Sequence, residues 1–152
     1  MDARELQRYL HEHIPLSKAM GVEVVEATEE RVTLSAPLAP NINHRETVFG
    51  GSASAVALLS AWALLYARLQ QVRLDCRIVI QRNTVEYERP ITGDFTASAT
   101  IDDTVTWRKF IASLTRRGRA RIAVTASLHC DSAQVGRLRG DFVALSMPAR
   151  AD

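Results

Sequence analysis

One stretch near the middle of the chain is apolar on all sides. Between residues 53 and 67 the only polar side chains are two serines and the hydroxyl of one tyrosine. This pattern predicts a helix from Ser52 to Leu69 that is buried on every side. The run is shorter than the roughly 20 residues needed to cross a bilayer. We therefore expect protein around this helix, and no membrane partner.

Segments in which hydrophobic and polar residues alternate predict about six strands around the helix. These segments are 22–27, 31–38, 77–87, 95–101, 119–130 and 134–145. In the third segment, Ile78 and Ile80 lie in one phase, whereas Val85 and Tyr87 lie in the other. A β-bulge at residues 81–84 would explain this change of phase.

The beginning of the chain predicts a helical strap. Residues 3–13 have an amphipathic helical spacing that Pro15 interrupts. A second short helical turn at residues 16–20 stops at Gly21. We expect residues 1–20 to lie across the core with their apolar side inward.

Short turns between successive strands favour antiparallel pairing. Residues 107–114 have helical spacing within a longer connection, and Gly118 is well placed to end that helix. The predicted fold class is α+β, with an antiparallel sheet of about six strands wrapped around one long helix. We expect a single domain over residues 1–152, with the loop and central helix of residues 40–71 at its centre.

Composition and charge argue against several classes of partner. At 152 residues and 47% hydrophobic residues, the chain suits one globular domain with a substantial core. The net charge of +2 and the 6% aromatic content do not favour nucleic acid as a partner. The two cysteines form no CxxC motif and no cluster with histidine, which suggests reduced thiols in the cytoplasm and no metal site. The sequence contains no P-loop and no dinucleotide-binding fingerprint, so we expect no cofactor.

The start of the central helix offers hydrogen-bond donors. Gly50 and Gly51 allow the backbone to approach a ligand closely, and Ser52 follows them at the first turn. The first N–H groups of a helix have no partner within it and carry partial positive charge. They could form an oxyanion hole for a thioester carbonyl. The alternative interpretation is a tight turn that leads into a helix.

The loop before the helix carries uncharged donors. Asn43 offers an amide NH₂ and Thr47 a hydroxyl, so both could reach one substrate. Each also has an ordinary structural role, as an Asx turn for Asn43 and a backbone-bonded hydroxyl for Thr47. Residues 52–71 contain no acid, and His44 and Glu46 are the loop side chains able to activate water. We therefore expect an apolar pocket without acids.

A basic cluster lies further along the chain. Residues 108–121 hold six basic side chains and no acid. Arg116, Arg117 and Arg119 are candidates for docking an acidic carrier protein or the phosphates of a nucleotide. A solvated basic face is the simpler alternative.

Three stretches resemble hotdog-fold proteins, in which a long antiparallel sheet wraps a central helix. They are residues 43–52 (NHRETVFGGS), 83–94 (NTVEYERPITGD) and 118–126 (GRARIAVTA). The first stretch, together with Trp62, resembles the C-terminal domain of YiiD-type proteins, which can follow an acetyltransferase domain. The chain is too short to hold that second domain, so it is similar to the stand-alone form, the malonyl-ACP decarboxylases of MadB type.

The resemblance implies an activity on thioesters of acyl carrier protein (ACP) or coenzyme A. Decarboxylation of malonyl-ACP to acetyl-ACP and CO₂, which feeds the start of fatty-acid synthesis, needs donors on the thioester oxygen but no base. The implied catalytic residues are Asn43 and Thr47, and the implied oxyanion and substrate-binding residues are Gly50, Gly51, Ser52, His44 and Phe49.

Two other functions stay open at this point. One is a thioesterase for acyl-CoA or acyl-ACP that uses a loop residue as its base, and the other is a non-catalytic binder of acyl carriers. The resemblance also implies a homodimer, or a tetramer built from it, because a hotdog monomer leaves a sheet edge uncovered. We expect residues 41–51 to lie near the seam of that dimer.

Overall fold

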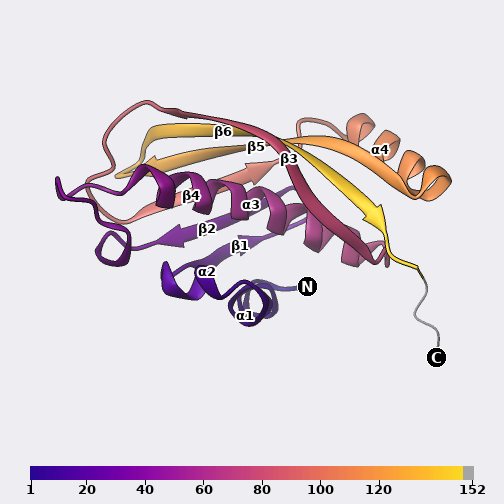
Figure 1. Ribbon diagram of the computed structural model, residues 1–152, viewed down its shortest axis with the longest axis horizontal. Helices are drawn as coiled ribbons and strands as arrows, with labels where there is room; N and C mark the ends of the chain where they lie inside the picture. The colour runs from indigo at the N-terminus through magenta and orange to yellow at the C-terminus, as the bar shows by residue number, and fades with distance from the viewer. Residues whose placement is uncertain (149–152) are drawn as a thin grey trace.

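The helices and strands follow one another along the chain as Figure 1 shows. The computed structural model describes residues 1–148. Its helices are α1 (Ala3–His13), α2 (Pro15–Ala19), the 3₁₀ helix η1 (Ala39–Asn41), α3 (Gly50–Gln71) and α4 (Thr104–Arg117). Its strands are β1 (Glu23–Ala27), β2 (Arg31–Ala36), β3 (Cys76–Tyr87), β4 (Phe95–Thr100), β5 (Arg119–Cys130) and β6 (Ala133–Ser146).

The six strands form one antiparallel sheet in the order β1-β2-β4-β5-β6-β3. The sheet curls around α3, which runs along its inner face (Figure 1). Alternate side chains of the strands point toward α3, and Leu34, Val124 and Leu128 among them are fully buried. Burial of one face of each strand selects this register, because a slip of one residue would turn polar side chains inward. The predicted α+β hotdog fold is confirmed.

The predicted bulge in the third long strand is also confirmed. The pairing of β3 with β6 shifts between Ile80 and Arg82, so Gln81 is the extra residue. Beyond the bulge, Val85 lies opposite Leu138, whose side chain is buried on the inner face. The bulge therefore returns Val85 and Tyr87 to the side of the sheet on which α3 lies.

The central helix is longer than its apolar pattern predicts. α3 begins at Gly50 and contains 22 residues, so both glycines lie in its first turn. By length and composition α3 could cross a membrane, and the expectation that it is too short was wrong. It is nevertheless the core helix of the domain, because Val56, Ala57 and Leu64 are fully buried against the sheet.

One face of α3 is only half buried, which differs from the prediction of burial on every side. This stripe consists of Ala55, Leu58, Trp62 and Tyr66, which recur at helical spacing. Trp62 and Tyr66 stack with ring centroids 5.1 Å apart, and Tyr66 stacks in turn on Tyr9 of α1 at 4.3 Å. Six strands do not close around the helix, so this stripe remains at the surface of the single chain.

The two edges of the sheet differ in what covers them. Helix α1, which an Asp2–Glu5 capping box begins, packs against β1. Its Gln7 side chain accepts a hydrogen bond from the Val24 N–H at 2.9 Å, and His11 contacts the Val22 carbonyl at 2.7 Å. At the other edge, β3 pairs with β6 on one side only, and most of its side chains are exposed.

Helix α4 follows β4 and leads back into the sheet. Phe110 and Leu114 are buried and hold it against the start of β5. Gly118 ends the helix with a φ of 72°, a left-handed conformation that favours glycine. The predicted helix and its stop are therefore confirmed.

Candidate active site

The loop before α3 is a closed turn. An isolated bridge pairs Ile42 with Val48, and the Asn43 N–H donates to the Thr47 carbonyl at 2.8 Å. Glu46 has a φ of 62°, and its N–H donates to the Asn43 carbonyl at 3.2 Å. The loop before α3 is thus ordered by its own backbone hydrogen bonds.

Asn43 and Thr47 contact each other directly. The Asn43 Oδ1 accepts hydrogen bonds from the N–H groups of Arg45 at 2.8 Å and Thr47 at 3.2 Å, which is the Asx-type arrangement. Its Nδ2 donates to the Thr47 Oγ1 at 2.9 Å. The hydroxyl hydrogen of Thr47 has no acceptor among residues 1–148. Asn43 therefore orients the Thr47 hydroxyl as a hydrogen-bond donor.

The first turn of α3 has two backbone amides without partners. Phe49 is the N-cap residue and supplies no side-chain cap. Its carbonyl accepts the N–H groups of Ser52 at 2.9 Å and Ala53 at 3.1 Å. Within residues 1–148, the N–H groups of Gly50 and Gly51 donate to no acceptor. These are the donors that a helix start presents to an anion.

The ring of Phe49 lies over the position that a side chain at Gly51 would occupy. A Cβ added at Gly51 would lie 2.4 Å from the Phe49 ring. The ring therefore lies directly against the helix start, although 58% of the side chain is exposed. The absence of a side chain at position 51 thus lets the Phe49 ring lie over the helix start.

Tyr87 is a neighbour of the site that sequence analysis did not select. Its hydroxyl donates to the Gly50 carbonyl at 3.2 Å, and its ring lies 3.6 Å from the position of a Gly50 Cβ. The phase change in β3 placed Tyr87 on the helix side, and the residue lies in one of the stretches that carry the resemblance. Those two signals place Tyr87 on the helix side of β3, but neither one places it beside Gly50.

Asn41 anchors the loop through hydrogen bonds of its buried side chain. It is buried, and its Nδ2 donates to the carbonyls of Met20 at 2.9 Å and Pro37 at 2.8 Å. Its own carbonyl accepts the Phe49 N–H at 2.8 Å. Asn41 thus ties the helical strap, the end of β2 and the start of α3 together, a role that only the packing reveals.

A cavity of about 410 Å³ opens beside the helix start. It is lined by Thr47, Val48, Gly50, Ala53, Tyr87, Glu88, Arg89, Pro90 and Ile91. The structure thus brings Thr47 and Gly50 together in one cavity, with Asn43 behind Thr47. His44 is exposed in the turn and does not line this cavity.

Glu88 corrects the expectation of a pocket without acids. The residue lines the cavity, but its Oε1 accepts from the Gln134 Nε2 at 3.2 Å and lies 3.6 Å from the Arg137 Nε. Both partners belong to β6, and Arg137 also pairs with Glu86 on the outer face of the sheet. The carboxylate is therefore held away from the amides of the helix start.

Nearly the whole chain matches the model of one protein family. Residues 3–146 match the model of the family described as "Putative thioesterase (yiiD_Cterm)". The chain belongs to this YiiD C-terminal family. Membership extends over nearly the whole chain, so both the turn and the helix start are parts of the family domain.

Solved structures agree with membership of the YiiD C-terminal family. A protein of unknown function from Chlorobaculum tepidum TLS is 27% identical, with a TM-score of 0.90 over 95% of this chain and 94% of that one. A protein from Shewanella oneidensis described as a "putative thioesterase" is 28% identical, with a TM-score of 0.83 over 96% of this chain and 97% of that one. A probable thioesterase from Pseudomonas aeruginosa shares the fold at 20% identity, with a TM-score of 0.84 over 97% of each chain.

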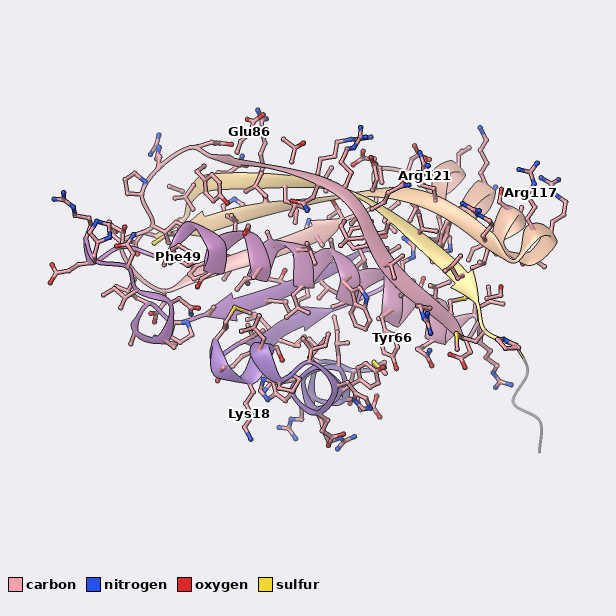
Figure 2. The ribbon with its side chains drawn as sticks, in the orientation of Figure 1. Lys18, Phe49, Tyr66, Glu86, Arg117 and Arg121 are labelled. Atoms are coloured by element: carbon pink, nitrogen blue, oxygen red, sulfur yellow. The ribbon has the colours of Figure 1, made fainter. Side chains whose placement is uncertain are left out.

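The basic cluster lies far from the helix start in this family member. Figure 2 shows Phe49 at one end of α3 and Arg117 and Arg121 beyond its other end. A 22-residue helix is about 33 Å long. Arg116, Arg117 and Arg119 are all exposed, but a single chain does not bring them to the cavity.

Proposed function

We propose that this protein is a malonyl-ACP decarboxylase that produces acetyl-ACP and CO₂. Its membership of the YiiD C-terminal family indicates action on acyl thioesters. The observation that supports decarboxylation most directly is the Asn43 Nδ2–Thr47 Oγ1 hydrogen bond of 2.9 Å beside the free amides of Gly50 and Gly51. It leaves a hydroxyl donor and a backbone donor at one cavity.

The proposed reaction uses these donors on the thioester oxygen. The bond between the carboxylate carbon and the α-carbon breaks, CO₂ leaves, and the electron pair moves into the thioester carbonyl to give an enolate. The Thr47 hydroxyl and the helix-start amides stabilise the enolate oxygen. A proton from water then adds to the α-carbon and yields the acetyl thioester. No residue of the chain needs to act as a base.

Hydrolysis of an acyl thioester is the second candidate. It is favoured by the family description and by Glu88, which lines the cavity. Glu88 would have to leave Arg137 and Gln134 before it could activate a water molecule. His44 and Glu46 are exposed in the turn, and neither lines the cavity. Decarboxylation needs no such rearrangement and is therefore preferred.

A homodimer is part of the proposal. The uncovered edge of β3 and the half-buried stripe of Trp62 and Tyr66 lie beside each other, since the Trp62 Nε1 donates to the Ile78 carbonyl at 3.2 Å. Antiparallel pairing of two β3 edges would cover both features. In that pairing the start of β3 in one copy lies opposite the end of β3 in the other copy. The basic cluster of one copy, near the start of β3, would then approach the helix start of its partner.

That arrangement gives Arg116, Arg117 and Arg119 a role across the dimer. An acidic carrier protein docked on the cluster of one copy would present its thioester to the cavity of the other. We place the reaction in the cytoplasm, where acyl carrier proteins and reduced cysteines are found together. Burial raises the pKa of the Cys76 thiol, so we assign this residue no nucleophilic part.

The deciding experiment is incubation with malonyl-ACP and measurement of the carrier mass. Loss of CO₂ supports decarboxylation, loss of the whole malonyl group supports hydrolysis, and an unchanged mass supports a non-catalytic carrier binder. Thr47→Val removes the hydroxyl without changing the shape of the side chain, and we expect it to slow turnover about 100-fold or more. Arg45→Ala, at an exposed side chain in the same turn but outside the cavity, is the matched control and should keep the rate. Equal rates for both variants would refute the site.

A further inference from the structure

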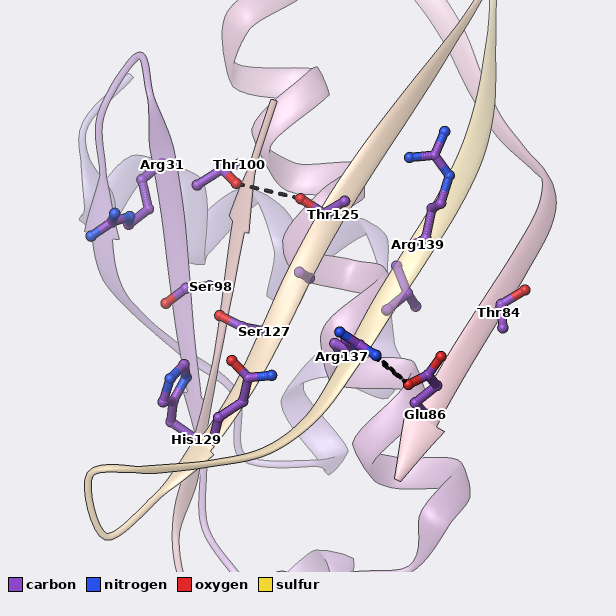
Figure 3. Close-up of a pocket in the computed structure, with 13 residues that line it drawn as sticks. Arg31, Thr84, Glu86, Ser98, Thr100, Thr125, Ser127, His129, Arg137 and Arg139 are labelled. Atoms are coloured by element: carbon purple, nitrogen blue, oxygen red, sulfur yellow. Dashed lines mark hydrogen bonds and ion pairs between the residues drawn. The ribbon is translucent and has the colours of Figure 1, made fainter. Parts of the chain in front are cut away.

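The outer face of the sheet, opposite α3, carries a hollow of about 830 Å³ (Figure 3). Strands β2, β3, β4, β5 and β6 all contribute to its lining. This hollow is larger than the cavity at the helix start, and no residue lines both. Gln134 and Arg137 of its lining hold Glu88, but the donors of the proposed reaction lie in the other cavity.

Strand register explains the shape of the hollow. Across the sheet, Arg31, Thr100, Thr125, Arg139 and Thr84 lie opposite one another in a single row. Thr100 and Thr125, on the two central strands, lie between Arg31 of β2 and Arg139 of β6 (Figure 3). Strands are about 4.8 Å apart, so the Cα atoms of Arg31 and Arg139 are separated by about 14 Å.

A second row runs beside the first. It consists of Thr33, Ser98, Ser127, Arg137 and Glu86, again opposite one another on successive strands. In this row the charges are matched, because the Arg137 Nη2 lies 2.7 Å from the Glu86 Oε2. Glu86 is the acid in the lining of the hollow.

The first row differs because its charges are not matched. Neither Arg31 nor Arg139 has a carboxylate oxygen within 4.0 Å among residues 1–148. The hydroxyls between them are 3.5 Å apart, and Thr125 also lies 3.4 Å from an Asp102 oxygen at the rim. These are long hydrogen bonds, so both hydroxyls remain available to a ligand.

We propose that this hollow binds a small phosphate-bearing molecule between Arg31 and Arg139. Guanidinium groups bind phosphate oxygens through paired, charge-assisted hydrogen bonds, and threonine hydroxyls add neutral donors. The lining contains no tyrosine, tryptophan or phenylalanine. The ligand is therefore held by its phosphates and polar groups, and 830 Å³ is within the size range of small-molecule sites.

A second copy of the chain is a less suitable occupant. Face-to-face packing of two outer faces would bring the unmatched Arg31 and Arg139 of one copy close to those of the other. Like charges brought together at an interface oppose association. A small polyanion instead neutralises both arginines at once.

The test is calorimetric titration of the full chain with inorganic triphosphate, with citrate as a carboxylate probe of similar charge. We expect saturable binding of triphosphate and weaker binding of citrate. Arg31→Gln and Arg139→Gln should each weaken triphosphate binding about tenfold, and Arg139→Lys should weaken it less, because lysine keeps the charge but not the paired geometry. Arg4→Gln and Arg8→Gln on α1 remove the same charge elsewhere and serve as matched controls.

Several outcomes would overturn the proposal. They are non-saturable binding, equal losses in the α1 controls, or citrate binding as tightly as triphosphate. A particle mass that falls in Arg139→Gln would instead identify a second copy as the occupant. Melting temperatures of all variants establish that each is folded, and Arg139→Lys keeps the test informative if a neutral variant does not fold.

Discussion

The starts of helices α3 and α4 differ in how their first amides are satisfied. Helix α4 begins with Asp103, whose side chain accepts from the N–H and the hydroxyl of Thr106. Helix α3 is longer, yet Phe49 at its start supplies no side-chain cap and two glycine amides are open. A cap contributes about 1 kcal/mol to stability. Helix α3 lacks this contribution, and α3 is the helix that begins beside the cavity. This favours a role for its open amides in ligand binding.

The largest expected effect comes from capping α3. Phe49→Asp would place a carboxylate where it can accept from the open amides, so the fold should be stabilised by up to about 1 kcal/mol. The same carboxylate would occupy the oxyanion position and repel a malonyl group. We expect the rate of decarboxylation to fall about 100-fold or more.

The measurements are carrier mass over time and a thermal melting curve. Phe49→Asn, which can cap without a charge, separates capping from repulsion. A Phe49→Asp variant that keeps the wild-type rate would show that the open amides do not bind the substrate oxygen.

The converse change removes the cap from α4. Asp103→Ala should lower the melting temperature by about a few degrees, because the first turn of α4 loses its cap. Turnover should not change, because α4 does not line the cavity. Asp103→Asn keeps a capping oxygen and should retain most of the stability. A loss of turnover in Asp103→Ala at temperatures where it is folded would contradict this assignment.

The same cap makes a pH-dependent contribution. Hydrogen bonds from Thr106 lower the pKa of Asp103 in the folded protein. A lowered folded pKa means that the stabilisation is present above the unfolded value of about 3.9 and is lost as pH falls through the folded value. Wild type should therefore lose more stability than Asp103→Asn between pH 5 and pH 3, as chemical denaturation at each pH can measure.

The smallest expected effect concerns the contact between β3 and the start of α3. Tyr87→Phe removes the hydrogen bond to the Gly50 carbonyl, which is 3.2 Å long and exposed. We expect less than about 1 kcal/mol of stability to be lost and only a few-fold change in turnover. A loss as large as that of Thr47→Val would instead show that the Tyr87 hydroxyl contacts the substrate.

Much of the fold was accessible to sequence analysis because its signals are local. The alternation along β5, the phase change in β3 and the stop at Gly118 each depend on residues within one segment, and all are confirmed. The half-buried face of α3 was missed for a different reason. Apolar residues alone do not reveal how far a six-stranded sheet can close around a helix.

The candidate site was accessible only in part. The Asn43–Thr47 separation suggested that both side chains could reach one point. In the structure they form a hydrogen bond with each other, so Asn43 would act by orienting the Thr47 hydroxyl. Glu88 and Tyr87 were not selected, because their place at the helix start depends on β3 returning along the whole sheet. Tyr87 and Gly50 are nearly forty residues apart, so no local pattern in the sequence indicates their contact.

By itself, the sequence determined the central helix, the alternating strands and the two glycines at the helix start, since hydrophobic periodicity and backbone freedom act over a few residues. Only the tertiary structure decided which side chains meet across the sheet. The row from Arg31 to Arg139 joins residues from distant parts of the chain through the register of four strands. That register is set by burial of the inner face, so the chemistry of the outer face is a consequence of packing on the other side.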